Sequence, residues 1–545
     1  MPAESIRPER SRTVDEITVC TASAFLRILR YITTLKEVFC LKSKLGLASV
    51  LFIGASLLLK VSGLIRDMVI AYYFGDSFVA DAYLAAFIIP NMFILFMRNG
   101  MKNAFVPSYI EALDKQRGEW HFGQVFKGTI VISLVIALLG VALAPVYIPL
   151  FYPEFSGQAT DIAIRISAIF FAAILFIGMD AVLEAFFDSQ NRFTMSMISQ
   201  IIVIVTSIGS AFLFADQIGA YSLAIGYVAG SIVSLFVMLY FVIPQNVMIF
   251  RHKLDWLEIR HFYWVFIPVG LTVAVGQINL MVGTMFASYF EEGAVTYINY
   301  AKNLVHMPQG IFGVTIGTIV FPLLSKAITT DDQKLFKRGI EQGLTSMYLI
   351  LLPSVIGMLL LMPNLITLLY ERGEFTSSAT MATTQVAYMY VGSVLFFSLN
   401  NIINKGFYSL KKGHLILVIS GLSILLNIVL NFILTGWVGY RGIPLAASVM
   451  ALFYVGTQFI VFYKLVGGLQ LHYLAVEFMK ITAATGIMAA AVYPLLQWID
   501  NWPNLVQITV IALTGAMLYV ISAYVLHSQA FRFLLDHLLK KKRKA

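Results

Sequence analysis

The stretch GLASVLFIGASLLLKVSGLIRDMVIAYYF at residues 46–74 is followed closely by FVADAYLAAFIIPNMFILFMR at residues 78–98. Both segments are long and apolar enough to cross the hydrocarbon core of a bilayer as helices. They nevertheless contain four charged residues, namely Lys60, Arg66, Asp67 and Asp81. A charge at the bilayer centre costs about 2.5 to 3.5 kcal/mol on insertion scales, so these side chains must avoid lipid. The stretch therefore predicts membrane helices that enclose a polar interior.

The composition extends the membrane prediction to the whole chain. Of its 545 residues, 59% are hydrophobic and only 12% are charged, which excludes an ordinary soluble enzyme. Because a backbone in lipid must satisfy its own hydrogen bonds, we expect an all-α polytopic membrane protein with about fourteen transmembrane helices. The expected spans are residues 46–74, 78–98, 124–151, 161–187, 193–215, 218–243, 263–290, 294–325, 344–370, 380–404, 414–435, 441–463, 474–498 and 505–527.

Two motifs recur at an offset of about 220 residues, which indicates an internal repeat. Residues 105–107 after the second span correspond to 320–322 after the eighth, and 186–192 correspond to 407–413. Two halves that start on the same side predict two six-helix lobes with a transport site between them. The expected parts are a cytoplasmic basic amphipathic N-terminal segment (1–45), an N-terminal lobe (46–243), a cytoplasmic linker (244–262), a C-terminal lobe (263–467), two additional helices (468–527) and a basic cytoplasmic tail (528–545).

Basic residues concentrate in alternate loops, for example at Lys115, Arg192 and Lys326, whereas the opposite loops carry acidic residues such as Glu154 and Glu292. By the positive-inside rule, this pattern predicts that both termini are cytoplasmic. We interpret the formal net charge of +9 as topology and contact with anionic lipids, and we expect no nucleic-acid partner.

The first 45 residues contain no uninterrupted apolar core of the signal-peptide type. Apolar residues recur at helical spacing over residues 25–39, which predicts an amphipathic helix on the inner leaflet; a mis-assigned start is the alternative. The two cysteines, Cys20 and Cys40, both lie in this segment. We therefore expect no extracytoplasmic disulfide and no metal site.

The charged residues of the first two spans allow two interpretations. Lys60 and Asp67 are seven residues apart on one helical face, and Arg66 could meet Asp81 across a short hairpin, which would give self-neutralised pairs. Alternatively, a water-filled cavity accepts an anionic cargo. Two cations on one helix, followed by further basic residues such as Arg98, favour the cavity.

These residues resemble a known family. The runs KVSGLIRD (60–67), ADAY (80–83), PN (90–91) and AFVP (104–107) resemble the first two helices of the MurJ (MviN) lipid II flippases. Part of the eighth span resembles the matching part of the family's second half, and the residues that carry this resemblance are Tyr300, Ala301, Pro308, Gly310, Gly313, Gly317, Thr318, Pro322, Ser325 and Lys326. This family belongs to the multidrug, oligosaccharidyl-lipid and polysaccharide exporter superfamily.

The resemblance covers residues 44–527 and implies a V-shaped cavity in the bacterial plasma membrane. Such a protein moves a polyprenyl-diphosphate-linked glycan from the inner to the outer leaflet by alternating access, for cell-wall or polysaccharide synthesis, without making or breaking covalent bonds. We also expect a monomer with no cofactor, with cell-wall synthesis proteins as candidate partners. The candidate substrate-binding residues are Lys60, Arg66, Asp67, Asp81, Asn91, Arg98, Lys302, Asn303 and His306.

The chain departs from the family pattern at several positions. Lys60 replaces an Arg, which keeps the charge but loses the bidentate fork suited to a diphosphate. An Arg and a Glu of the family's eighth helix fall on Asn303 and His306, where Lys302 could supply a replacement cation. These departures favour a divergent paralogue. Some members of the family have a sodium-binding position, which falls on Asn427 and Asn431 in this sequence. The carboxylate that those members have at this position is missing here, so sodium coupling is in doubt.

Further polar residues lie inside the expected spans. Asp180 and Glu184 could form a proton relay, or they could be satisfied by Arg192 or water. His306 could titrate near neutral pH or bond to a neighbouring helix. A polar group of the second half is expected either to line the cavity or to form interhelical hydrogen bonds: Asn400, Asn401, Asn404 and Lys405.

Two other functions remain as alternatives. A drug exporter of the same superfamily would need an acidic or aromatic cavity, which the basic first helix argues against. A membrane glycosyltransferase or glycan ligase would need catalytic residues on substantial outer loops, but the expected outer loops are only about ten residues or shorter. The sequence contains no GxxxxGK[ST] or HExxH motif, so ATP hydrolysis and metal-dependent proteolysis have no support.

Overall fold

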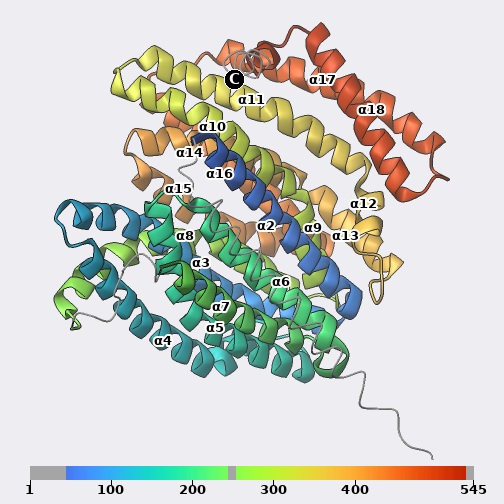
Figure 1. The fold of residues 1–545 in the computed structure, drawn as a ribbon. Helices are drawn as coiled ribbons and strands as arrows, with labels where there is room; N and C mark the ends of the chain where they lie inside the picture. The colour runs from blue at the N-terminus through green and yellow to red at the C-terminus, as the bar shows by residue number, and fades with distance from the viewer. Residues whose placement is uncertain (1–44, 243–252, 535–545) are drawn as a thin grey trace, which may run out of the picture. The chain divides into compact units, whose positions relative to one another are not determined.

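The structure is a computed structural model that describes residues 45–242 and 253–534. Within these ranges the secondary structure is helical and contains no strand, which confirms the all-α prediction (Figure 1). The helices are α2 (Leu45–Phe74), α3 (Phe78–Asp114), α4 (Gly118–Phe151), α5 (Gly157–Ser189), α6 (Phe193–Ile218), α7 (Tyr221–Val242), α8 (Trp256–Ala287), α9 (Ala294–Val305), α10 (Met307–Thr329), α11 (Gln333–Leu360), α12 (Met362–Leu369), α13 (Ser377–Met389), α14 (Val391–Ser409), α15 (Gly413–Val438), the 3-10 turn η2 (Gly439–Arg441), α16 (Gly442–Leu465), α17 (Leu471–Trp498) and α18 (Asn504–Val525).

Each expected span falls mainly on helical residues of the described ranges, but three of them are divided into two helices. The breaks separate α9 from α10 at His306, α11 from α12 at Leu361, and α13 from α14 at Tyr390. Pro308 and Pro363 stand in the first turn of α10 and of α12. Proline lacks a backbone N–H, so it is tolerated in a first turn but cannot continue a preceding helix.

Nine helices of the described residues are long and apolar enough to cross a membrane, or ten if α13 and α14, which are bent by 45°, form one span. One of the nine is the stretch Gly413–Leu465, in which α15 and α16 are joined by η2 and pack on each other, and it covers two expected spans. The chain is therefore a polytopic membrane protein, and the count of fourteen crossings stays a prediction.

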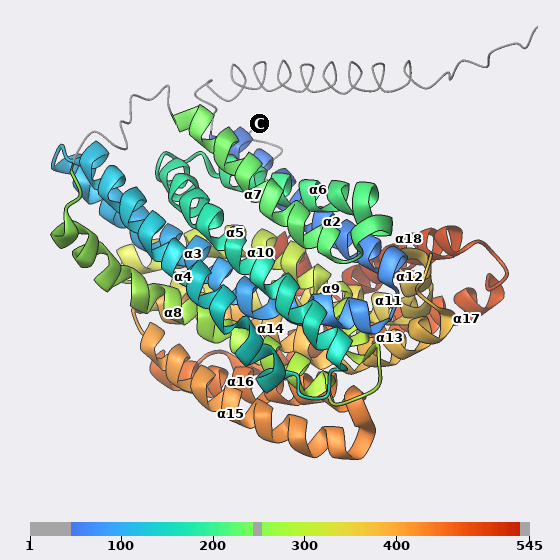
Figure 2. The same ribbon diagram turned by 90° about the horizontal axis from the view of Figure 1, so that it is seen from below.

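Helix packing separates into groups. In the first half, α5 is central and contacts α3, α4, α6 and α7. In the second half, α14 contacts α10, α11 and α16, while α15 lies alongside α16 (Figure 2). Helices α17 and α18 pack on each other and against α11 (Figure 1). Helix α8 contacts α3 and α4 and also α15, so it touches both groups, and the division into two lobes stays a prediction.

Small residues allow the membrane helices of the first half to approach closely. Gly226 and Gly230, one turn apart on α7, face α6. A Cβ atom at Gly226 would lie 2.9 Å from Ser207 Cα, and one at Gly230 would lie 2.8 Å from Val203 Cα. Without a hydrophobic driving force between helices in lipid, such contacts hold the helices together through close van der Waals packing.

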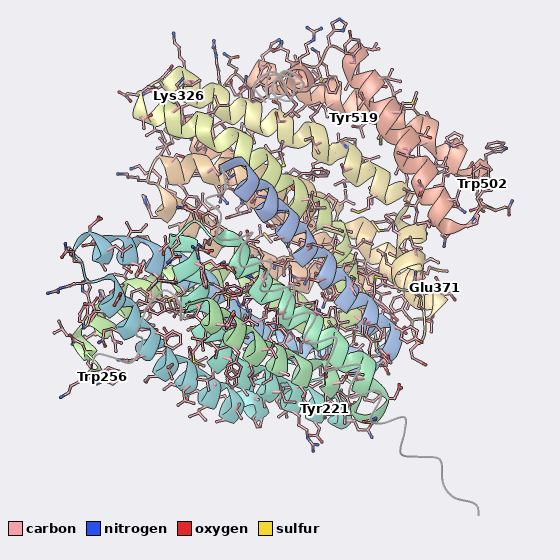
Figure 3. The ribbon with its side chains drawn as sticks, viewed as in Figure 1. Tyr221, Trp256, Lys326, Glu371, Trp502 and Tyr519 are labelled. Carbon is pink, nitrogen blue, oxygen red and sulfur yellow. The ribbon has the colours of Figure 1, made fainter. Side chains whose placement is uncertain are left out.

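Residues of loops that are predicted to lie on opposite sides of the membrane lie at opposite ends of the helices. Lys326 and Trp256 lie toward one end of the helices, and Glu371 and Trp502 lie toward the other (Figure 3). The residues expected on the outer side also contact one another, since Tyr297 donates a hydrogen bond to Asp76 at 2.7 Å. Which end faces the cytoplasm stays a prediction.

Several predictions fall on residues outside the described ranges. They concern the amphipathic N-terminal segment with Cys20 and Cys40, most of the linker at 243–252, and the basic tail from residue 535 onward.

Candidate functional site

A cavity of about 1050 Å³ opens between α2, α8, α9, α10, α14, α15 and α16, with Asn103 reaching it from α3. The charged residues that line it are three cations and one carboxylate: Lys60, Arg66, Lys302 and Asp67. Counting +3 and −1, their formal charges give a net charge of +2. The cavity is therefore basic, as the sequence predicts for an anionic cargo.

Arg66 is held by its neighbour in sequence. Its Nη2 lies 2.9 Å and its Nε 3.3 Å from Asp67 Oδ1, and its guanidinium lies 5.5 Å from the centre of the Phe87 ring. Asn303 of α9 donates to the other oxygen, Asp67 Oδ2, at 2.8 Å. The Asp67 carboxylate thus fixes the Arg66 side chain and joins α2 to α9, because both of its oxygens are engaged.

Lys60 and Lys302 line the cavity without an ion pair among the described residues. Lys60 lies beside α10, where a Cβ at Gly310 would be 3.4 Å from Lys60 Cε. Self-neutralisation, the alternative interpretation, therefore applies to Arg66 but not to Lys60. Two cations without a carboxylate partner in a membrane cavity call for an anionic ligand or water.

Asp81 does not meet Arg66, so the expected pair across the hairpin is wrong. Asp81 is buried, and its Oδ2 accepts from the Gly293 N–H at 2.8 Å. Its Oδ1 accepts from the Thr296 N–H at 2.8 Å and from the Thr296 hydroxyl at 2.6 Å. These groups form the N-terminus of α9, whose unpaired N–H groups attract a carboxylate more strongly than the hairpin neighbour does.

Further contacts join the same ends of the two halves. The Phe78 N–H donates to Glu292 Oε1 at 2.6 Å, and the Glu374 N–H donates to the Tyr72 carbonyl at 3.1 Å. Gly75 has a φ of +57°, and a Cβ there would lie 2.3 Å from the Glu374 carbonyl oxygen, so only glycine fits. Together with Asp81 and its partners, we call these contacts the outer contact cluster. They close the predicted outer end of the molecule.

Three predicted substrate-binding residues lie away from the cavity: Asp81, which belongs to the outer contact cluster, and also Asn91 and Arg98. Asn91, in the middle of α3, is absent from its lining. Arg98 is turned toward α5, with Nη1 3.7 Å from Glu184. Helix α3 packs along α5, so the face that carries Arg98 and Lys102, one turn apart, meets α5 instead of the cavity. The sequence analysis also offered Arg192 as a partner of Glu184. The structure instead pairs Glu184 with Arg98 and Lys102.

With this geometry established, comparison with known proteins is decisive. Residues 70–529 match the family described as lipid II flippase MurJ. The chain belongs to the MurJ family. It is 28% identical over 421 residues to a probable lipid II flippase MurJ of Buchnera aphidicola subsp. Baizongia pistaciae, covering 75% of this chain and 80% of that protein.

Solved structures agree with the MurJ assignment. A lipid II flippase MurJ in an inward closed conformation aligns with a TM-score of 0.76 at 26% identity, covering 89% of this chain and all of that one. An inward-facing multidrug transporter of the MATE family aligns with a TM-score of 0.62 at 13% identity, covering 77% and 98%. The second likeness extends the fold to the wider superfamily, as the sequence predicts.

At the positions where this MurJ protein departs from the family pattern, the structure shows neutral contacts. His306 lines the cavity and bonds through Nδ1 to Gln309 at 2.8 Å and through Nε2 to Ser393 of α14 at 3.2 Å. This is the interhelical bond that the sequence offered as one alternative. Asn303 supports Asp67, and Lys302 lines the cavity beside it.

The sequence reading did not identify the wall of the cavity formed by α15. Its polar residues recur at intervals of three and four on one face: Ser420, Ser423, Asn427 and Asn431. This spacing on an otherwise apolar helix was the available signal. Of the α14 group, Asn400 and Asn404 also line the cavity, and both have carbonyl Oδ1 atoms without a hydrogen-bond partner among the described residues.

The sodium position of some MurJ proteins falls on an amide cluster. Asn427 Nδ2 donates to Asn279 Oδ1 at 3.1 Å, and Asn431 Nδ2 donates to Asn427 Oδ1 at 2.9 Å. These donors are neutral, and no group of three His, Cys, Asp or Glu residues suited to a metal occurs in the described part of the chain. The residues do not fit a cation site that depends on carboxylate oxygen. We derive no sodium-dependent step.

Proposed function

We propose that this protein is a flippase for a polyprenyl-diphosphate-linked glycan, lipid II or a related precursor, in the bacterial inner membrane. The observation that carries the proposal is the basic cavity of a MurJ-family chain, in which Lys60 and Lys302 form no ion pair with a carboxylate of the described ranges. Two unit charges 4 Å apart attract by about 4 kcal/mol at an effective dielectric constant of 20. A diphosphate is therefore strongly favoured over a neutral or cationic cargo.

Arg66 orients the diphosphate, because its planar guanidinium can make two parallel hydrogen bonds, whereas a lysine ammonium cannot. Because Asp67 Oδ1 engages its Nε and Nη2, the other guanidinium edge remains for the diphosphate. Amide and hydroxyl groups of α14 and α15 line the same cavity and suit the glycan, which presents hydroxyl and amide groups. The drug-exporter alternative has weaker support, since the single lining carboxylate is already engaged by Arg66 and Asn303.

Translocation by alternating access requires the outer contact cluster to part. Asp81 must leave the N-terminus of α9, and the contact between Gly75 and Glu374 must open. Release of the cargo on the far side would then follow from exposure of the basic cavity to outer water. No covalent step belongs to this activity.

The test is charge reversal in the cavity. Lys60→Glu and Arg66→Glu should each abolish complementation of a flippase-depleted strain while protein abundance stays normal. Lys115→Glu is the matched control, because Lys115 is exposed on a loop and pairs only with Glu111 among the described residues. Normal growth with both cavity variants would exclude the anionic cargo. Mass spectrometry of the lipid that copurifies with the protein would identify the glycan.

A further inference from the structure

A second group of charged side chains lies within the first half, apart from the cavity. It is formed by residues of α3 and α5, which pack along each other (Figure 1). We call it the buried ion cluster, and its members are Arg98, Lys102, Asp180, Glu184 and Asp188. Asp180 and Glu184 are 0% exposed and Arg98 is 6% exposed. Buried charges of this kind require partners.

Two of the three carboxylates are well satisfied. Glu184 lies 3.7 Å from Arg98 and 3.5 Å from Lys102, and it accepts a hydrogen bond from Ser199 at 2.9 Å. Asp188 lies 3.2 Å from Lys102 and accepts from Ser196 at 2.6 Å. Both cations of the cluster are thus engaged by Glu184 and Asp188.

Asp180 is left without a partner. Neither of its oxygens accepts a hydrogen bond from the described residues, and Arg98 Nε and Nη2 are likewise unpaired. The hydroxyls of Ser199 and Ser234 approach the Asp180 carboxyl but are directed elsewhere, since Ser234 donates to Ser199 at 2.8 Å and Ser199 donates to Glu184.

The groups around Asp180 are contributed by α5 itself and by the four helices that pack on it, α3, α4, α6 and α7. The charged groups that face it are Arg98 of α3 and Glu184 of its own helix. Tyr227 of α7 lies beside these two, and α6 contributes the Ser199 hydroxyl. On α4, the Ser133 hydroxyl lies against Gly178 of α5. It fills the space that a side chain at position 178 would need.

The charge balance of the cluster indicates what Asp180 binds. With all members ionised, three carboxylates and two cations give a net charge of −1 in a dry interior. One proton restores neutrality, and it belongs on Asp180, the carboxylate of the cluster that has neither an ion pair nor a hydrogen bond among the described residues. We propose that Asp180 is a proton-binding site, protonated in this conformation, and that release of its proton transfers Arg98 from Glu184 to Asp180.

The atoms without a hydrogen bond on Arg98 and on Asp180 are suited to pair with each other after this transfer. When Asp180 loses its proton, its two oxygens can accept from the two unpaired nitrogens of Arg98. Glu184 keeps Lys102 and Ser199. Ser234 donates to Ser199 and Ser199 donates to Glu184, so the proton of Asp180 passes along these groups to Glu184 and leaves to the water beside Lys102, whose side chain is 22% exposed and which stays protonated.

The two arrangements of Arg98 would bias the position of α3. This helix carries Asp81 of the outer contact cluster at its start and reaches the cavity through Asn103. A shift of Arg98 between two α5 carboxylates is therefore a two-state element that links the proton to the elements that must move during transport.

Infrared spectroscopy of the purified full-length protein in nanodiscs, without cargo, tests the site independently of transport. The wild-type protein should show the carbonyl band of a protonated carboxylic acid that shifts in D₂O, and Asp180→Asn should lack it. Asp161→Asn is the matched control, because Asp161 is exposed on the same helix. If Asp180→Asn misfolds by size-exclusion chromatography, Asp180→Glu should move the band instead of removing it.

A second variant tests the charge balance. Glu184→Gln leaves two carboxylates for two cations, so Asp180 should ionise and its acid band should disappear although Asp180 is still present. In the wild-type protein the band should fade as the pH is raised. Equal spectra of wild-type and Asp180→Asn protein would overturn the proposal, as would a band removed by sodium but insensitive to pH or an acid band that persists in Glu184→Gln.

Discussion

The cavity and the buried ion cluster use the same residue types in opposite proportions. The cavity has three cations and one carboxylate, and two of its cations form no ion pair within the part of the chain that the structure describes. The cluster has two cations and three carboxylates, and within the same residues one of its carboxylates has no ion pair or hydrogen bond. An excess of positive charge that lines open space favours an external anion, whereas an excess of negative charge sealed between helices favours a proton. The expected ligand of each region therefore depends on the sign of its excess charge and on whether that charge lines open space or lies between helices.

The largest expected effect separates the two regions by stability. Arg98→Ala should destabilise the protein by about 3 to 5 kcal/mol, because it removes one of the two cations of the buried ion cluster and leaves Lys102 alone to serve Glu184 and Asp188. Lys60→Ala should leave stability nearly unchanged, since Lys60 is exposed to the cavity and has no ion pair among the described residues. Thermal unfolding followed by fluorescence-detection size-exclusion chromatography measures both. Equal loss in the two variants would contradict the distinction between the regions.

The next effect concerns the closed end of the molecule. Cysteines placed at Asp76 and Glu292, in a background with Cys20 and Cys40 replaced by Ser, should be joined by a short reducible thiol crosslinker. Asp76 bonds to Tyr297 and Glu292 bonds to the Phe78 N–H, so both sites belong to the closed contact. The crosslink should stop flipping, and reduction should restore it. Full transport with complete crosslinking would show that this end does not open.

A smaller effect is expected when the link between α2 and α9 is weakened. Asp67→Asn keeps the shape of the side chain but removes the charge that holds Arg66. A charged hydrogen bond contributes about 1.5 to 3 kcal/mol, so cargo affinity should fall by about tenfold to a hundredfold. Binding of the copurifying lipid measures this loss, with Asp161→Asn as the exposed control. Unchanged affinity would mean that Arg66 needs no support.

The smallest effect on activity is expected for the cysteine variants that test the orientation of the protein in the membrane by labelling. Cysteines at Ser156 and Glu292 should react with an impermeant thiol reagent added outside intact cells, and cysteines at Lys115 and Lys334 should not. Flipping should remain near normal in the Ser156, Lys115 and Lys334 variants. Reversed labelling would place the closed end at the cytoplasmic face and reverse the proposed direction.

Hydropathy was sufficient to predict the helices, since every expected span falls mainly on helical residues of the described ranges. The family resemblance, and not hydropathy, brought Lys60, Arg66 and Lys302 together, and the structure places all three on the lining of one cavity. Hydropathy and periodicity were not enough for two other charged residues. These residues are Asp81 and Arg98. Their partners are distant in sequence or on another helix, and periodicity gives the buried face of a helix but not the neighbour that it meets.

The proline-marked breaks show the same limit. Pro308 and Pro363 were visible in the sequence, yet the long apolar runs around them suggested continuous spans. A proline in the first turn begins a new helix without removing a needed hydrogen bond, so a break costs little there. The sequence alone does not say whether such a proline bends a helix or starts one.

The attachment of Asp81 to α9 has a consequence for the membrane as a barrier. Asp81 accepts three hydrogen bonds that must be broken before the outer end can open. If their net loss amounts to about 4 kcal/mol, only about one molecule in a thousand stands open at rest. A cell that holds a cavity of this size in its inner membrane would thereby avoid a steady leak of ions and metabolites.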